Sequence, residues 1–214
     1  MKLISSSLLS ADFGNLQRDI EMLNASDCDW LHVDVMDGIF VPNISFGQPV
    51  VRYIKKYAQK PLDMHLMISE PDRYIRDFKE AGADILTVHY EACTHLDRTL
   101  NTIKEFEIQC GVAINPATPV ALLEDSIQLC NIVVLMSVNP GFGGQGFIEN
   151  TYSKVRQLRD LCSRKNSKCL IEVDGGVNVD NAHKLFKTGA DVLVAGSSVF
   201  HSVNPAKTIK ELKK

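Results

Sequence analysis

The sequence predicts a (β/α)8 barrel, also called a TIM barrel, on three observations. Eight short apolar runs rich in β-branched residues recur along the chain, and segments with helical spacing separate them. Dividing 214 residues by eight leaves about 27 for each unit, enough for one strand, one helix and two short loops. No Gly-x-Gly-x-x-Gly follows the first run, which disfavours an open, doubly wound sheet. We therefore expect eight parallel strands closed into a barrel and ringed by helices.

The strands are expected at the apolar runs, taken in chain order. These are residues 3–9, 30–36, 62–67, 85–89, 111–114, 132–138, 170–174 and 192–195. We expect a helix after each strand, as the apolar spacing of residues 16–23 and 155–161 indicates. Gly82 and Gly189 stand where a helix would end, and Thr118 before Pro119 is typical of a helix start. The eight units account for the chain, so residues 1–214 are expected to form a single domain.

Composition excludes several classes of protein. Hydrophobic residues make up 45% and charged residues 23%, which is ordinary globular usage. Lysine and arginine number 23 against 26 acidic residues, with no basic block, so we expect no nucleic-acid partner. The apolar runs fall far short of the ~20 residues of a membrane helix, and the first residues carry no targeting signal, so we expect no membrane partner and a cytoplasmic location. The six cysteines form no CxxC pair and are expected to be reduced.

Polar side chains close several of the apolar runs. Because barrel enzymes place their active site at the carboxyl ends of the strands, these positions are the first candidates. In the second run the period of two puts His32 and Asp34 on one face. His65 holds the same kind of position in the third run, and Asp174 closes the seventh. We therefore expect two histidines and two carboxylates to converge at the mouth of the barrel.

Two imidazoles and two carboxylates are a suitable ligand set for one divalent metal ion. Ligand distances of ~2.0 to 2.2 Å would suit zinc, iron(II), manganese or cobalt, and the pattern does not choose among them. The alternative is a polar network without metal. Glu172 shares the parity of Asp174 and should lie one layer deeper, where an unpaired carboxylate is costly, so we expect it to be hydrogen-bonded to a neighbouring strand.

Three methionines, Met36, Met67 and Met136, fall at or near strand ends. Core filling is the usual role of methionine. The alternative is a polarisable apolar lining that keeps water away from a carbanion-like intermediate.

A glycine-rich segment follows the sixth run, with four glycines in the six residues 141–146. Missing Cβ atoms let backbone N–H groups close around an anion, although a flexible loop is the alternative. Glycines after the seventh and eighth runs add donors, and barrels commonly seat a phosphate there. The candidate residues are Gly141, Phe142, Gly143, Gly144, Gly175, Gly176, Gly196 and Ser197. We expect a small phosphorylated substrate whose head reaches the metal.

Several of these motifs resemble the ribulose-phosphate 3-epimerase family. They are LHVDVMDGIFVPN at 31–43, DMHLM at 63–67, LMSVNPGFGGQ at 135–145 and EVDGGV at 172–177. SSSLLSADF at 5–13 and VAGSSVF at 194–200 extend the match over the whole chain. Ser6 is a departure, because related sequences often have proline before the substrate-contacting serine. We interpret it as a difference in backbone rigidity that leaves the site intact.

The resemblance implies an isomerase of the pentose phosphate pathway that interconverts D-ribulose 5-phosphate and D-xylulose 5-phosphate. It implies that His32, His65, Asp34 and Asp174 bind the metal and that the two aspartates exchange protons. It also implies that Ser7, together with His65, Asp174 and the glycine loops, holds the substrate. We expect a homo-oligomer of unknown size.

The implied chemistry explains why such groups are needed. Inverting C3 of a ketose takes a proton from one face and returns one to the other, so two acid/base groups must flank the sugar. A Lewis acid can stabilise the resulting enediolate. One alternative is a member of the family that acts on another ketose phosphate, such as allulose 6-phosphate. A decarboxylase/aldolase would carry Asp-x-Lys-x-x-Asp, but Met36 stands at the position of that lysine. A third alternative is a catalytically inactive barrel that senses sugar phosphates. Such a protein would lack one of the acid/base groups or metal ligands, and this sequence retains all of them.

Overall fold

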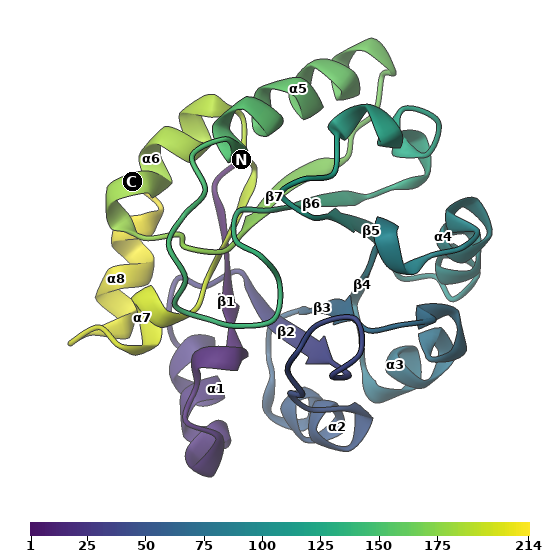
Figure 1. Cartoon of the computed structure of the whole chain (residues 1–214). Coiled ribbons are helices and arrows are strands. Elements are labelled where there is room, and N and C mark those ends of the chain that lie inside the picture. The colour runs from purple at the N-terminus through teal and green to yellow at the C-terminus, as the bar shows by residue number, and fades with distance from the viewer.

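Eight parallel strands close into a barrel surrounded by helices in the computed structural model, which describes residues 1–214 (Figure 1). The strands are β1 (Leu3–Ser7), β2 (Trp30–Met36), β3 (Leu62–Met67), β4 (Ile85–His89), β5 (Gln109–Ile114), β6 (Ile132–Met136), β7 (Leu170–Asp174) and β8 (Val192–Ala195). Each strand pairs with its neighbours in chain order, and β8 pairs with β1. The predicted (β/α)8 barrel is confirmed.

Two strands are shorter than the apolar runs that predicted them. β1 ends at Ser7 because the next residues form the 3-10 turn η1 (Leu8–Ser10), where the Ser7 hydroxyl accepts a hydrogen bond from the Leu9 N–H. β6 ends at Met136, where the glycine-rich loop begins. β5 begins two residues earlier than predicted, at Gln109, because Gln109 still pairs with Ile85 of β4.

The eight α-helices are not distributed as one after each strand. They are α1 (Leu16–Asn24), α2 (Gln48–Tyr57), α3 (Ile75–Ala81), α4 (Leu96–Glu105), α5 (Thr151–Arg164), α6 (Val179–Thr188), α7 (Ser197–Phe200) and α8 (Pro205–Leu212). Both α7 and α8 follow β8, whereas two 3-10 turns, η5 (Val120–Leu123) and η6 (Ile127–Leu129), join β5 to β6. None of the helices is both long and apolar enough to span a membrane.

The helix predicted to start at Thr118-Pro119 is therefore wrong. Pro119 keeps an extended backbone with ψ 138°, and only a short 3-10 turn follows it. The signals at the other ends of helices are confirmed: Gly82 and Gly189 cap α3 and α6 with φ of 115° and 123°. A positive φ of this kind suits glycine, because it lacks a Cβ atom.

The barrel wall separates two cores. Side chains on the outer face of the strands pack against the helices in one apolar cluster of 48 buried residues. Inside the barrel a smaller apolar cluster is centred on β4, β5 and β6; its members are Ile85, Ala113, Ile132, Val134, Met136 and Val138. The inward side chains of β1, β2, β3 and β7 are instead largely polar: Ser5, Ser7, His32, Asp34, Asp63, His65 and Glu172 are all buried. One half of the barrel interior is thus apolar and the other half carries ionisable groups.

Gly111 of β5 allows the close approach of β4. A Cβ atom at this position would lie 2.1 Å from Oγ1 and 3.3 Å from Cα of Thr87. Gly111→Ala should therefore lower the free energy of unfolding by about 1–3 kcal/mol, the usual range for overpacking, as measured by urea denaturation. Gly146→Ala is the control, because its Cβ would meet nothing within 4 Å. Equal losses of stability in the two variants would contradict this account.

Candidate active site

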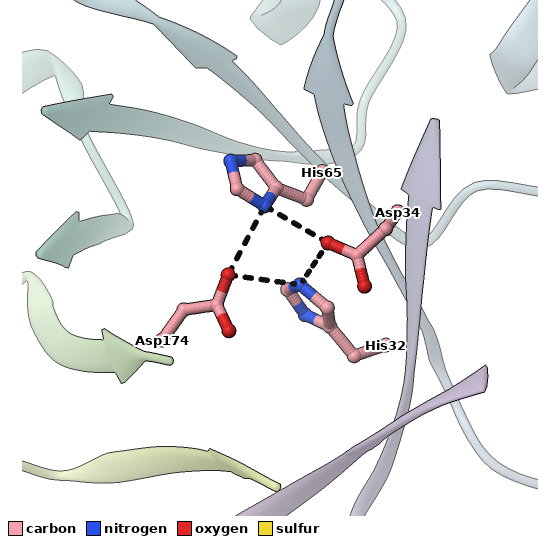
Figure 2. A group of neighbouring side chains, drawn as sticks. All are labelled: His32, Asp34, His65 and Asp174. Carbon is pink, nitrogen blue, oxygen red and sulfur yellow. Dashed lines mark ion pairs between the residues drawn. The ribbon is translucent and has the colours of Figure 1, made fainter. Parts of the chain in front are cut away.

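Four polar side chains meet at the carboxyl ends of the strands (Figure 2). His32 and Asp34 come from β2, His65 from the adjacent β3, and Asp174 from β7 on another part of the wall. His65 Nδ1 lies 3.3 Å from Asp34 Oδ1 and 3.5 Å from Asp174 Oδ2. His32 Nε2 lies 3.3 Å and 3.9 Å from the same two oxygens. The structure therefore brings together the four residues that the sequence singled out.

The residues of this cluster fit a divalent metal ion. Their ligand atoms all lie within 4.8 Å of one another. Four ligands at ~2.0–2.2 Å from a tetrahedral zinc ion would be roughly 3.3–3.6 Å apart, close to the distances found. His32 Nε2 and His65 Nδ1 are buried and have no hydrogen-bond partner, which is costly unless another group satisfies them. The cluster is a candidate metal site whose donors do not select one ion.

The charges of the cluster hold one another in place. Burial disfavours every charged form here, but opposite charges outweigh it. The imidazoles of His32 and His65 hold the pKa of Asp34 below its usual range. Asp174 and Asp34 raise the pKa of His65 to about 9, and Asp34 and Asp63 raise that of His32 well above its usual value. A metal ion that binds here must displace these protons, so its affinity depends on pH.

A second layer of polar groups lies below the cluster. His32 Nδ1 is 2.7 Å from Asp63 Oδ2, which also accepts a hydrogen bond of 2.9 Å from the Ser5 hydroxyl. Asp63 shares the inward parity of His65 on β3, so the alternation of the strand could have indicated it. Because its other nitrogen faces Asp63, His32 presents Nε2 to the cluster.

The expectation that Glu172 is hydrogen-bonded to a neighbouring strand is wrong. The residues beside it on β6 and β8 are Val134 and Val192, which offer no polar side chain. Its polar neighbours are His32, which lies across the barrel with Nδ1 3.4 Å from Oε1, and Asp63, and neither carboxylate oxygen has a hydrogen-bond partner. Burial, together with the charge of Asp63, raises the pKa of Glu172 to about 8.

Behind His65 lies a further histidine that the motifs did not indicate. His89 is fully buried at the end of β4, and its Nε2 is 2.9 Å from Nε2 of His65. Its Nδ1 is 3.1 Å from Glu91 Oε2. Burial, opposed by Glu91, lowers the pKa of His89 to about 4, so the ring is neutral near pH 7. Its place as the last residue of a predicted strand was the available signal.

A cleft of about 530 Å³ opens above the cluster. It is lined by most of the predicted site residues: Ser7, Asp34, Met36, Met67, Met136, Gly141, Phe142, Gly143, Gly144, Asp174, Gly175, Gly176, Gly196 and Ser197. His32 and His65 are absent from this lining because both are fully buried beneath its floor. Ser10 and Gln145 also line the cleft, and the sequence pattern did not single them out.

Ser7 lines the cleft and contacts Asp34 of the four-residue cluster. Its hydroxyl donates a hydrogen bond of 2.6 Å to Asp34 Oδ2, leaving Oδ1 directed at the two histidines. The three methionines pack in apolar clusters and also line the cleft. Met36 and Met67 pack with Val41 in a small apolar cluster and also line the cleft, and Met136 joins the interior apolar cluster beside it.

The loops after β6 and β7 pack closely at the rim. Gly176 has φ 63°, and a Cβ atom there would lie 2.8 Å from the backbone of Phe147. The Asn43 amide donates a hydrogen bond of 2.9 Å to the carbonyl oxygen of Gly141, joining the loop after β2 to the glycine-rich loop after β6. The glycine-rich segment is thus tied to its surroundings on two sides.

Fold and site together define a TIM-barrel enzyme with a buried histidine and aspartate cluster below a glycine-lined cleft. Solved structures similar in fold include KGPDC from Streptococcus mutans, with TM-score 0.75 and 14% identity over 100% of this chain and 96% of that one. A mutant tryptophan synthase α-subunit from Pyrococcus furiosus gives TM-score 0.71 and 14% identity over 99% and 95%. At such identities these likenesses show the fold alone.

The comparison of sequences is more specific. The model of the ribulose-phosphate 3 epimerase family matches residues 3–200. The chloroplastic ribulose-5-phosphate-3-epimerase of Arabidopsis thaliana is 47% identical over 99% of this chain and 76% of its own length. The ribulose-phosphate 3-epimerase of Bacillus subtilis is 47% identical over 98% and 97%. This chain belongs to the ribulose-phosphate 3-epimerase family.

His65 should make the metal-free protein less stable as pH rises. Folding raises its pKa from 6.5 to about 9, so the folded state binds the proton more tightly than the unfolded state does. This stabilisation is fully present below pH 6.5 and is lost as the pH approaches 9. The melting temperature of chelator-treated protein should fall across this range, and His65→Asn should flatten the profile. A melting temperature that rises with pH in the absence of metal would contradict the prediction.

Proposed function

We propose that this chain inverts C3 of a ketose phosphate and interconverts D-ribulose 5-phosphate and D-xylulose 5-phosphate. Membership of the family, with relatives that carry this activity in their names, supports the proposal. The observation that carries it is the placement of two carboxylates, Asp34 and Asp174, on different parts of the wall around one cleft (Figure 2).

The cleft suits a small sugar phosphate. We assign the phosphate to backbone N–H groups of the glycine-rich loops after β6, β7 and β8, where barrel enzymes commonly bind it. The residues are Gly141, Phe142, Gly143, Gly144, Gly175, Gly176, Gly196 and Ser197. The sugar then extends toward Ser7, His65 and Asp174, so that its C2 and C3 atoms lie over the four-residue cluster.

Proton transfer falls to the two aspartates. One carboxylate takes the proton from C3 on one face, and the other carboxyl group delivers a proton to the opposite face. Each turnover leaves the pair with exchanged protonation states, so the enzyme can start from either epimer. Ser7 keeps one oxygen of Asp34 occupied by a hydrogen bond, which fixes the direction of the other. Met36, Met67 and Met136 form apolar surface beside the reacting carbons and limit the access of water.

We assign one divalent ion to His32, Asp34, His65 and Asp174, and zinc, iron(II), manganese and cobalt all suit these donors. When bound, the ion supplies Lewis-acid stabilisation of the negative charge that develops at the C2 oxygen of the substrate. The two imidazoles lie below the cleft floor, and with the ion bound their cluster-facing nitrogens would carry no proton for the sugar. They serve as ligands, and the aspartates serve both as ligands and as acid/base groups.

Further proposals concern the setting of the enzyme. We propose that residues 1–214 act as one catalytic domain, in the cytoplasm, as a homo-oligomer, with no nucleic-acid or membrane partner. The continuous barrel supports a single catalytic domain. The net charge of −3 supports the absence of a nucleic-acid partner. The exposed side chains of Ile39 and Ile44 supply apolar surface for subunit contact. Light scattering measures the mass of the assembly, and cell fractionation tests the compartment, which differs from the one in the name of the Arabidopsis relative.

Asp174→Asn should reduce epimerisation by at least ~10²-fold while the protein stays folded, because general acid/base groups contribute about 10²–10⁴-fold. Mass spectrometry in D₂O adds a sharper readout. With Asp34 intact, the variant should still exchange the C3 proton of one epimer with solvent, without inversion. Metal content is measured in the same sample. Normal turnover in a variant that retains its metal would remove Asp174 from proton transfer.

Removal of divalent ions should stop the reaction, and adding one back should restore it, because the charge at the C2 oxygen then lacks a Lewis acid. Elemental analysis of protein purified without chelator identifies the ion. Full activity in demonstrably metal-free protein would defeat the assignment.

The choice of sugar is tested by kcat/KM for D-ribulose 5-phosphate and D-allulose 6-phosphate, measured side by side. The pentose phosphate should be preferred, as the family membership indicates. A higher kcat/KM for the hexose phosphate would show that the same chemistry serves another substrate.

A further inference from the structure

Three residues form a continuous hydrogen-bonded chain from the floor of the cleft toward the surface. His65 on β3 contacts His89 on β4, Nε2 to Nε2, at 2.9 Å, and His89 Nδ1 lies 3.1 Å from Glu91 Oε2 in the turn η4 (Tyr90–Ala92). Both histidines are fully buried, and their rings stack with centroids 5.0 Å apart and planes 22° apart. Of these three residues, only His65 belongs to the four-residue cluster.

Glu91, the outermost of the three hydrogen-bonded residues, is held in place by its own hydrogen bonds. Glu91 Oε1 accepts a hydrogen bond of 2.8 Å from the backbone N–H of Asn115 and another from the hydroxyl of Thr118. The ring of Phe40 lies against His89, with centroids 4.7 Å apart. Glu91 Oε2 is therefore directed at the histidine and held in that position by groups outside the barrel.

The hydrogen bonds among His65, His89 and Glu91 are consistent with only one placement of the protons. A carboxylate can only accept, so His89 must carry a proton on Nδ1 and donate it to Glu91. A neutral His89 then has a lone pair on Nε2, which requires His65 to donate from its own Nε2. His65 in its neutral form therefore has its lone pair on Nδ1, the atom that faces Asp34 and Asp174. The reverse direction would set the lone pair of His89 Nδ1 against the carboxylate.

We infer that Glu91 and His89 form a relay that fixes His65 in the tautomer whose Nδ1 lone pair faces the cluster. Both are positioning residues, since neither lines the cleft. The inference rests on the proposed metal site. His32 is fixed by a different partner, Asp63, and presents Nε2 instead. The two imidazoles therefore offer unlike nitrogens, each chosen by the group behind it.

Zn²⁺ affinity measured by competition with a chromophoric chelator tests the relay. His89→Phe keeps a ring in the stack but removes the acceptor, and it should weaken Zn²⁺ binding by about 10- to 100-fold, the usual cost of losing such a partner. Glu91→Gln should weaken binding by a smaller factor, because a neutral amide accepts less strongly than a carboxylate. Thr87→Val is the matched control: Thr87 is buried on the same strand, and its hydroxyl has no hydrogen-bond partner.

Unchanged affinity in His89→Phe, or an equal loss in Thr87→Val, would overturn the relay. So would a Glu91→Gln variant that binds Zn²⁺ as tightly as the unmodified protein. None of these outcomes touches the metal site itself, since the unmodified protein still binds the ion.

The tautomers themselves can be read in ¹H–¹⁵N spectra of the unmodified protein, which do not depend on any variant folding. His89 should be neutral and protonated on Nδ1, with or without Zn²⁺. His89 protonated on Nε2 instead would overturn the inference. If the unmodified protein binds no Zn²⁺, the proposed metal site fails, and the tautomer of His89 still decides the relay.

Discussion

The mutual neutralisation of buried charges inside the barrel is the constraint on which the rest of the structure depends. His32 lies between Asp34 above and Asp63 below, and all three side chains are buried. Removing one partner from such a set would leave an uncompensated buried charge, at a cost of about 3–5 kcal/mol. The barrel can hold ionisable groups in its interior only because they come as a matched set from several strands.

The geometry of parallel strands makes this set possible. All carboxyl ends lie at one end of a closed barrel, and every second side chain points inward. Asp63 and His65, two residues apart on β3, therefore occupy successive layers, and in each layer they meet the side chains of β2 at the same height. The alternation of inward and outward side chains along the strands therefore places the ligands at the floor of the cleft and their supporting partners one layer below.

This regularity also explains what the sequence could predict. Strand alternation and strand ends were enough to indicate the barrel and the four residues of the cluster. The connection from β5 to β6 was misjudged because Thr118-Pro119 carries a helix-start signal on a segment that forms only 3-10 turns. The surroundings of Glu172 were misjudged because they are set by His32, which reaches it across the barrel and not along the sheet. Likewise, the contact of His89 with His65 depends on ring orientation, which periodicity does not describe.

The division of the barrel interior into a polar and an apolar half has an evolutionary consequence. Ionisable groups come from β2, β3, β7 and the end of β4, whereas β5 and β6 contribute only apolar side chains to the interior. Val138 belongs to the interior apolar cluster and lines the cleft, so it can change in bulk without altering a ligand or a proton carrier. A lineage built on this barrel can therefore remodel the shape of its cavity while inheriting its reaction intact.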